Sequence, residues 1–212
     1  SSFMQGDVCF TAPDVTARES YTLRAILTDG TGKVLHYTDE SVEIFPHMAE
    51  EPGTAVSVSG EAFLARQEEL TSVAASGKTI VINGLEPGTY DIAGTEVKVK
   101  ACGMRALHFV SRKTGHPLVE GFTPYDFRLW YDTEKDRITP LLRRTFTADG
   151  MTPILTSGNS LTASAWGQKL YPAFACAEMK CGNGKIILNE VDLDSHLANP
   201  VARIFKNRLM RY

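Results

Sequence analysis

Trp130, Tyr131 and Asp132 form the densest group of side chains in this chain that could bind a small polar ligand. Aromatic rings can cover the apolar face of a pyranose, while carboxylates accept hydrogen bonds from its hydroxyl groups. His116 and Asn159 are the candidate neighbours that would complete such a site. The same residues also have a structural interpretation, because Trp and Tyr pack at domain interfaces and Asn is a common turn residue. The residue types therefore leave two hypotheses open, sugar contact and packing at an interface.

The cysteines and histidines predict neither a nucleophile nor a metal site. A catalytic cysteine needs a tight strand-to-helix elbow and a positioned histidine, whereas Cys102 and Cys181 each precede a glycine in segments that form no such elbow. Cys176 and Cys181 lack the second pair of Cys or His ligands that would complete a zinc site. His108 lies within an apolar segment, which is typical of a core histidine. We therefore predict no catalytic residue, no metal and no cofactor.

Charge and hydropathy argue against two classes of partner. The 212 residues carry a net charge of −3, which offers no electrostatic attraction for nucleic acid or an anionic membrane. No apolar run approaches the roughly 20 residues that a membrane helix needs. Gly182, Asn183 and Gly184 look like part of a phosphate-binding loop, but such loops follow a strand and open a helix, and this one precedes a strand. We expect a helix-to-strand turn there.

The elements that would position these residues fall into two regions, and the first, 1–46, is β in character. Tyr21–Leu27 alternates apolar and polar residues as a half-buried strand does, and Asp29–Gly32 supplies a turn. The segments 33–36 and 42–45 are further short strands. Because a β-sandwich needs about seven strands, this region must depend on the rest of the chain or on further sequence.

The second region, 47–212, alternates apolar strands with helical segments. Such alternation predicts an α/β domain with a mostly parallel sheet. The expected buried strands are 79–83, 153–156 and 185–189. The expected helices are 61–76, closed by Gly77, then 169–180, and a last helix with Asn199 as N-cap and Pro200 in its first turn.

Three stretches carry a resemblance to a known family: Phe109–Asp132, Pro153–Asn159 and Asn199–Phe205. They resemble the C-terminal region of bacterial glycoside hydrolases of family two, the β-galactosidase-like enzymes. The resemblance covers most of the chain, from the hairpin at Tyr21 to the final helix, and is loose in Leu85–Met104. In that family the region lies far downstream of the catalytic barrel.

The resemblance implies a fold for each region. Residues 1–46 would be the remnant of an immunoglobulin-like β domain. Residues 47–212 would form a class I glutamine-amidotransferase-like domain, which is a flavodoxin-like three-layer α/β sandwich with a mostly parallel sheet. The amidotransferase motifs themselves are missing. The chain has no Gly-x-Cys-x-Gly elbow, and His196 is followed by Leu197 and Ala198 and therefore does not begin the expected His-x-Glu pair.

The implied function is that of a non-catalytic accessory segment. The family's catalytic barrel alone takes roughly 250 residues, which leaves no room for it in this chain. The resemblance therefore implies a parent enzyme that hydrolyses glycosidic bonds, with its upstream domains as partners of this segment. None of the candidate acids lies in the family's catalytic motif; they are Glu120, Asp126, Asp132, Glu178, Glu190, Asp192 and Asp194.

Two alternatives to an accessory segment stay open. The chain could be a carbohydrate-binding module acting in its own right, or a self-contained amidotransferase-like hydrolase with a reactive cysteine. The sequence leaves the compartment open, although a periplasmic or extracellular location would suit the parent enzyme.

Overall fold

The computed structural model describes residues 9–47, 53–103, 106–159 and 171–212. The chain divides into two compact units, Ser1–Ala49 and Glu50–Tyr212, and each is described by itself. The boundary that the sequence predicts between residues 46 and 47 separates two domains of different families, and that assignment stays a prediction.

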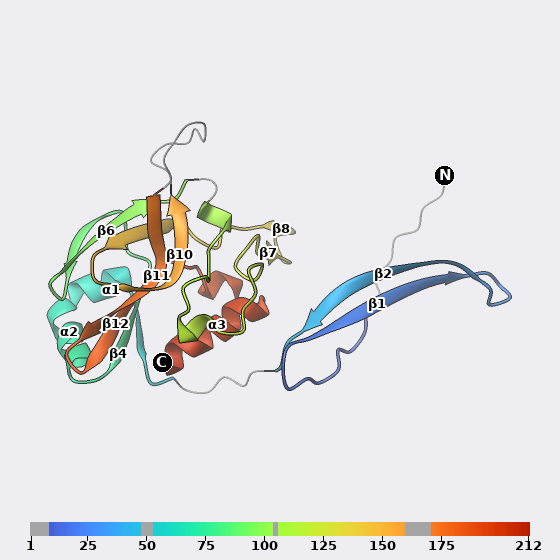
Figure 1. The fold of residues 1–212 in the computed structure, drawn as a ribbon, viewed down its shortest axis with the longest axis horizontal. Helices are drawn as coiled ribbons and strands as arrows, with labels where there is room; N and C mark the ends of the chain where they lie inside the picture. Colours follow the sequence, from blue (N-terminus) through green and yellow to red (C-terminus); the bar gives the residue numbers. More distant parts are fainter. Residues whose placement is uncertain (1–8, 48–52, 104–105, 160–170) are drawn as a thin grey trace. The chain divides into compact units, whose positions relative to one another are not determined.

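The first unit is an antiparallel ribbon of two strands, β1 (Glu19–Thr28) and β2 (Val34–Ile44) (Figure 1). The Asp29 carboxylate holds the turn between them, because it accepts hydrogen bonds from the backbone N–H groups of Thr31 (2.9 Å) and Lys33 (3.0 Å). The hairpin predicted around this turn is confirmed. Its return segment is one continuous strand and not the two short strands that we expected.

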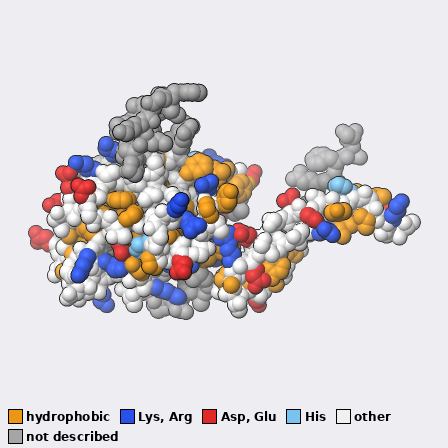
Figure 2. Space-filling view, viewed as in Figure 1, with side chains coloured by type: hydrophobic (Ala, Val, Ile, Leu, Met, Phe, Trp, Pro, Cys, Tyr) orange, Lys and Arg blue, Asp and Glu red, His pale blue; other side chains and the backbone are white. Residues whose placement is uncertain are grey.

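The ribbon has a polar face and an apolar face, because side chains alternate along each strand. On the polar face Arg24 pairs with Asp39 at 2.7 Å and lies over the Tyr37 ring. No residue of either strand is buried, and Figure 2 shows hydrophobic side chains along the ribbon. The apolar face carries Tyr21, Leu23, Leu27, Val42 and Ile44. An isolated two-stranded ribbon is marginal in water, and the assignment of 1–46 to an immunoglobulin-like domain stays a prediction.

The second unit is built on one mixed sheet of eight strands. Its order is β3-β4-β12-β11-β9-β6-β5, with β10 paired to β11 (Figure 1). Only the neighbours β3, β4 and β12 are parallel, and the other pairs are antiparallel. The strands are β3 (Val56–Ser59), β4 (Thr79–Asn83), β5 (Gly88–Ile92), β6 (Thr95–Ala101), β9 (Arg144–Ala148), β10 (Thr152–Asn159), β11 (Tyr171–Cys181) and β12 (Gly184–Asn189).

This sheet overturns the predicted flavodoxin-like three-layer sandwich with a mostly parallel sheet. Parallel neighbours need a long crossover, usually a helix, whereas antiparallel neighbours need only a turn. In this unit β3 and β4 are joined by helices, but β5–β6 and β11–β12 are hairpins. The unit is therefore mostly β, with a curled mixed sheet. The glycine loop at 182–184 is correspondingly a turn between two strands and not the expected helix-to-strand turn.

Three α-helices accompany the sheet in the described residues: α1 (Gly60–Ala65), α2 (Gln67–Ala75) and α3 (Pro200–Arg211). The helix predicted over 61–76 is present but is interrupted at Arg66. Gly77 follows it with φ +114°, as expected for a residue that ends a helix. At α3 the side chain of Asn199 accepts a hydrogen bond from Val201 N (2.9 Å), and the predicted cap is confirmed.

The helix predicted over 169–180 is wrong, because residues 171–181 form strand β11. Its alanines favour a helix by propensity. However, Ala173, Ala175, Ala177, Met179 and Cys181 are all buried at a period of two, which is the periodicity of a strand. Burial in the sheet therefore outweighs the local preference of the alanines.

Two apolar clusters fix the second unit. On one face of β4 and β12, Ile80, Ile82 and Leu188 pack with Phe63 of α1 and Leu70 of α2. The opposite face is covered by α3, so helices lie on both sides of the parallel strands (Figure 1). Around α3 a second cluster is aromatic and consists of Phe122, Phe127, Trp130 and Phe205.

The segment 106–142 that carries the aromatic cluster has little regular structure. It contains the short helical turns η1 (Ala106–His108) and η2 (Pro117–Val119) and the two-stranded pair β7 (Tyr131–Asp132) and β8 (Arg137–Ile138). A third such turn, η3 (Asp194–His196), precedes α3. No helix in the described ranges is both long and apolar enough to cross a membrane.

Candidate functional site

Trp130, the first of the residues predicted to bind a ligand, lies in the core. Its ring is only 2% exposed, and its Nε1 donates a hydrogen bond to the Asp126 carbonyl oxygen (2.6 Å). The ring packs against Phe127 and His196 at centroid distances of 6.1 and 5.1 Å. In this place Trp130 fixes the aromatic cluster around α3, which agrees with the packing hypothesis for this residue.

Tyr131 and Asp132 lie in β7, where Tyr131 is exposed and Asp132 is partly buried. Tyr131 is 51% exposed and its hydroxyl group donates to the Asp136 carboxylate. Asp132 pairs with the Lys135 ammonium (2.5 Å) and accepts from the backbone N–H of Glu134 (3.1 Å). The pKa of Asp132 is lowered, mainly because its carboxylate accepts the hydrogen bond from Lys135. The carboxylates of Asp132 and Asp136 thus stabilise the turn between β7 and β8.

His116 is buried and forms part of a polar cluster. Its Nδ1 accepts a hydrogen bond from Leu118 N (3.2 Å), so the neutral ring carries its proton on Nε2. That Nε2 lies 3.5 Å from Glu178 Oε1 and 3.5 Å from the Tyr212 hydroxyl. Lys185 completes the cluster, with its Nζ 3.4 Å from Glu178 Oε2 and 3.6 Å from the centre of the Tyr212 ring. The cluster ties η2, β11, β12 and the end of α3 together.

Asn159, the last predicted residue, ends β10 opposite Tyr171 of β11. Its side chain lies outside the described part of the structure. The structure therefore does not bring His116, Trp130 and Tyr131 together in one pocket. A ligand-binding role for the five residues stays a prediction.

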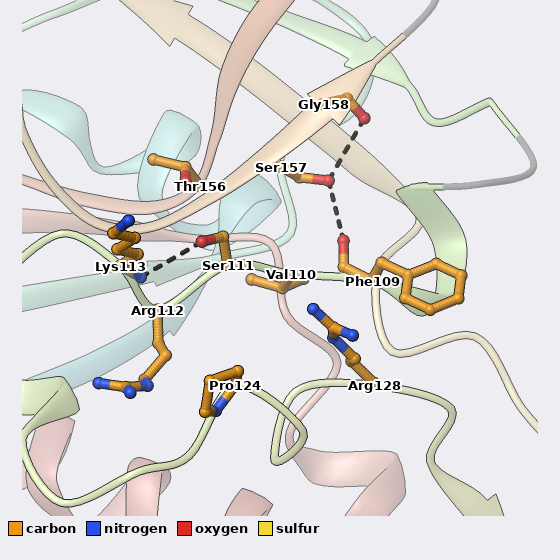
Figure 3. Close-up of a pocket in the computed structure, with 10 residues that line it drawn as sticks. All are labelled: Phe109, Val110, Ser111, Arg112, Lys113, Pro124, Arg128, Thr156, Ser157 and Gly158. Carbon is orange, nitrogen blue, oxygen red and sulfur yellow. Dashed lines mark hydrogen bonds between the residues drawn. The ribbon is translucent and has the colours of Figure 1, made fainter.

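A different place in the same stretches forms a cavity with a volume of about 750 Å³. We call it the basic cavity. It lies where the segment 109–113 runs beside the end of β10, next to the loop that contains Pro124 and Arg128 (Figure 3). Its lining consists of Phe109, Val110, Ser111, Arg112, Lys113, Pro124, Arg128, Thr156, Ser157 and Gly158.

Backbone pairing on two sides holds the segment 109–111 in place. Ser111 and Thr156 exchange backbone hydrogen bonds of 2.7 and 2.9 Å, which attaches the segment to β10. On its other side Phe109 pairs with Arg128, and Val110 N donates to the Phe127 carbonyl oxygen (3.1 Å). The segment thus acts as the middle strand of a small three-stranded layer. Such a backbone presents its side chains in a fixed geometry.

Of the residues that the structure describes, three cations and no acid line the basic cavity. Figure 3 shows Pro124 between the side chains of Arg112 and Arg128, with Lys113 and the Phe109 ring at opposite ends of the view. The Arg128 guanidinium lies 5.4 Å from the centre of the Tyr125 ring. The buried Nε of Arg112 has no hydrogen-bond partner in the described ranges. The chemistry of the cavity is therefore that of a site for hydrogen-bond acceptors.

The sequence-based prediction singled out the stretch that forms this cavity but not the residues that line it. Arg112 and Lys113 are consecutive cations in that stretch, and a pair of this kind is usually a solvated surface. Arg128 lies 15 residues further along and Thr156 lies on another strand, so only the fold reveals that they meet. Consecutive cations beside an apolar segment were the one local signal available.

A second, smaller cavity of about 380 Å³ contains Asp132. Charges of both signs line it, including Arg137, Arg143 and Asp192. Its His196 is already engaged, because Nε2 lies 2.8 Å from Thr139 Oγ1 and Nδ1 lies 2.7 Å from the Asp192 carbonyl oxygen. Internal pairing thus occupies much of the polar lining of this cavity.

The half-buried thiol of Cys102 and the buried thiol of Cys176 do not favour a cysteine nucleophile. Burial raises the pKa of Cys102 to about 12 and that of Cys176 well above its ordinary value. The reactive form of cysteine is the thiolate, which such an environment disfavours. No group of three or more His, Cys, Asp or Glu side chains in the described ranges is arranged to hold a metal ion.

Comparison with known proteins gives little. No protein-family model matches the sequence, and no curated protein matches it. One solved structure with some similarity is the β-galactosidase of Rahnella sp. R3, with 14% identity and a TM-score of 0.38. The alignment covers 74% of this chain and 22% of that protein. A similarity this distant carries no conclusion about activity, substrate or partners, and the family-two and amidotransferase assignments stay predictions from the sequence.

Proposed function

We propose that this chain is a non-catalytic accessory segment of a β-galactosidase-like glycoside hydrolase, and that its basic cavity contacts the saccharide. One observation carries the proposal. The ten described residues that line the cavity all lie within two of the stretches that resemble the family, Phe109–Asp132 and Pro153–Asn159. The third stretch opens α3, whose Phe205 packs on Phe127 at 5.4 Å. The resembling residues thus converge on one site and its support.

The lining of the cavity suits binding and not cleavage. A retaining glycosidase needs two carboxyl groups about 5 Å apart, and no acidic residue is among the described residues that line this cavity. Ser111, Thr156 and Ser157 instead contribute hydroxyl groups, of which Ser157 Oγ donates to the Phe109 carbonyl oxygen (3.1 Å). Small polar groups beside apolar surface are the usual combination in small-ligand pockets.

Phe109 is the aromatic surface that a sugar ring would contact. Phe109 is 43% exposed, although the backbone of both its chain neighbours is hydrogen-bonded to the segment 127–129. An exposed phenylalanine on a fixed backbone can cover the apolar face of a pyranose at little cost in conformational entropy. The same surface would stay partly wetted without a ligand, which offers a reason for binding.

The proposal is tested by titrating the chain with lactose and following its backbone amide NMR signals. We expect weak binding, with shift changes confined to the lining of the basic cavity. Phe109→Ala should abolish these changes, because it removes the aromatic surface. Tyr131→Ala is the matched variant, since Tyr131 is an exposed aromatic residue outside the cavity. It should bind lactose as the unmodified chain does.

Three results would contradict the proposal. The first is the absence of any shift change at saturating lactose, and the second is loss of binding on Tyr131→Ala with Phe109→Ala unaffected. The third is hydrolysis of a nitrophenyl β-galactoside by the purified chain at an enzyme-like rate.

A carbohydrate-binding module acting in its own right is the alternative. It is favoured by the fact that residues of the second unit alone line the cavity. The affinity distinguishes the two functions, because a module must hold its ligand without help from other domains. Binding of galactose or lactose in the millimolar range or tighter, lost on Phe109→Ala, would favour the module.

A further inference from the structure

The charge of the basic cavity goes beyond what a neutral saccharide requires. Arg112, Lys113 and Arg128 approach one cavity from two segments of the chain, and its described lining contains no acid. No carboxylate within the described ranges forms an ion pair with any of the three. Like charges that share a site repel each other, and an anion between them would relieve this repulsion. The arrangement is therefore complementary to a negatively charged ligand.

The two arginines are suited to a flat or tetrahedral oxyanion. A guanidinium group presents its N–H donors as a planar fork, which matches the oxygens of a carboxylate or sulfate. The Nε of Arg112 is buried and lacks a partner in the described part of the chain. Because protein atoms cover this nitrogen, the N–H groups left for a ligand are those of the two terminal nitrogens of the guanidinium. Arg128 is steadied by its contact with the Tyr125 ring.

The remaining lining argues for a sugar that bears the anionic group. A free inorganic anion would need only the cations, whereas Phe109, Val110 and Pro124 give the cavity an apolar part. Ser111 and Thr156 add hydroxyl groups to the same lining. An acidic pyranose combines an apolar ring face, hydroxyl groups and an oxyanion in one molecule.

We propose that the basic cavity selects a saccharide with an anionic substituent, a uronate carboxylate or a sulfate ester, which Arg112 and Arg128 hold and Lys113 attracts. This inference rests on the proposed function and names the class of saccharide that the same cavity takes. Figure 3 shows both arginines beside Pro124 in the cavity. Phe109 packs against the apolar face of the sugar ring, as it does in the proposal for neutral sugars.

The test compares four probes by calorimetric titration of the full chain: digalacturonate, a sulfated galactobiose, neutral galactobiose and inorganic sulfate. At least one acidic saccharide should bind more tightly than neutral galactobiose, by a factor of about ten or more. Added salt should reduce this difference. The acidic saccharide that binds more tightly identifies the substituent.

Variants assign this preference to the two arginines. Arg112→Gln and Arg128→Gln should each weaken the binding of the acidic saccharide much more than that of neutral galactobiose, and so remove most of the difference between the two affinities. Arg112→Lys should restore part of it, because it keeps the charge but not the fork. Lys78→Gln, at an exposed lysine outside every described cavity, makes the same change of charge and should have no effect.

Each other outcome overturns the inference. Equal affinities for acidic and neutral saccharides would overturn it and leave the proposed function standing. Binding of inorganic sulfate as tight as that of the acidic saccharides would show that the sugar contributes nothing. An equal loss of affinity in Lys78→Gln would indicate nonspecific charge attraction. Absence of binding by every saccharide would overturn the proposed function together with this inference.

Discussion

Among single residues, Glu190 combines a charge with burial in a way that affects stability. Its side chain follows β12, is 7% exposed, and accepts a hydrogen bond from Leu85 N (2.8 Å). Burial raises the pKa of its carboxyl group from 4.5 to about 7, although the Leu85 hydrogen bond and the charge of Arg144 act in the opposite direction. The folded chain therefore holds a proton at Glu190 over a pH range in which the unfolded chain has released it.

This difference predicts a dependence of stability on pH. Between pH 4.5 and about 7 the native state binds more protons than the unfolded state, so the free energy of unfolding falls as pH rises. The full loss is about 3 kcal/mol. Urea unfolding of Glu190→Gln should lack this decrease, since the amide keeps an acceptor for Leu85 N. The exposed control Glu61→Gln should keep it, and an identical pH dependence in all three proteins would contradict the assignment.

The candidate site shows what residue types can and cannot predict. Trp130 and Arg112 were equally visible in the sequence, and the aromatic residue attracted the binding hypothesis. Its size, however, makes burial strongly favourable, and the fold places it in the core at 2% exposure. Arg112 resembled an ordinary surface cation, because the residues that make its surroundings a cavity come from other segments. A single sequence contains no local record of such long-range neighbours.

Among the elements, the turn between β11 and β12 depends on a glycine for close packing. A Cβ at Gly184 would lie 2.2 Å from the Lys78 carbonyl oxygen and 2.4 Å from that of Ala74. Both contacts are backbone atoms at the end of α2 and the turn after it, so they cannot rotate away. The tip of the β11–β12 hairpin is thus seated against the end of α2.

Gly184→Ala should therefore lower the free energy of unfolding of the second unit by about 1–3 kcal/mol, the usual cost of overpacking. Thermal or urea unfolding of the purified chain measures this loss. Gly30→Ala is the control, because a Cβ at Gly30 meets no atom within 4 Å. Equal stability of both variants would mean that the hairpin tip is not packed as the structure has it.

The elements also show where local patterns suffice. The cap at Asn199 and the stop at Gly77 were predictable, because both depend on neighbouring residues. The apolar strand 79–83 was predictable from its composition, and it is parallel to β12 as expected. The rest of the sheet was not, because the sense of a strand depends on the path of the chain between strands. Short turns at 93–94 and 182–183 make β5 antiparallel to β6 and β11 antiparallel to β12.

At the scale of the whole molecule, the two units have very different internal support. The second unit buries two apolar clusters, whereas no residue of β1 or β2 in the first is buried. Hydrogen exchange of a backbone amide requires opening of its hydrogen bond, and a ribbon without a core opens at little cost in free energy. A single cooperative transition for the whole chain is therefore not expected.

Amide hydrogen exchange measured by NMR should reveal this division. The amides of β4 and β12 should exchange only through unfolding of the second unit, while those of β1 and β2 should exchange orders of magnitude faster. Phe205→Ala tests the separation, because it removes a side chain of 0% exposure from the aromatic cluster. It should cost the second unit about 3–5 kcal/mol and speed exchange in β4 and β12 accordingly. Exchange in β1 and β2 should not change, since the first unit has no share in that cluster; a parallel acceleration there would show that both units unfold together.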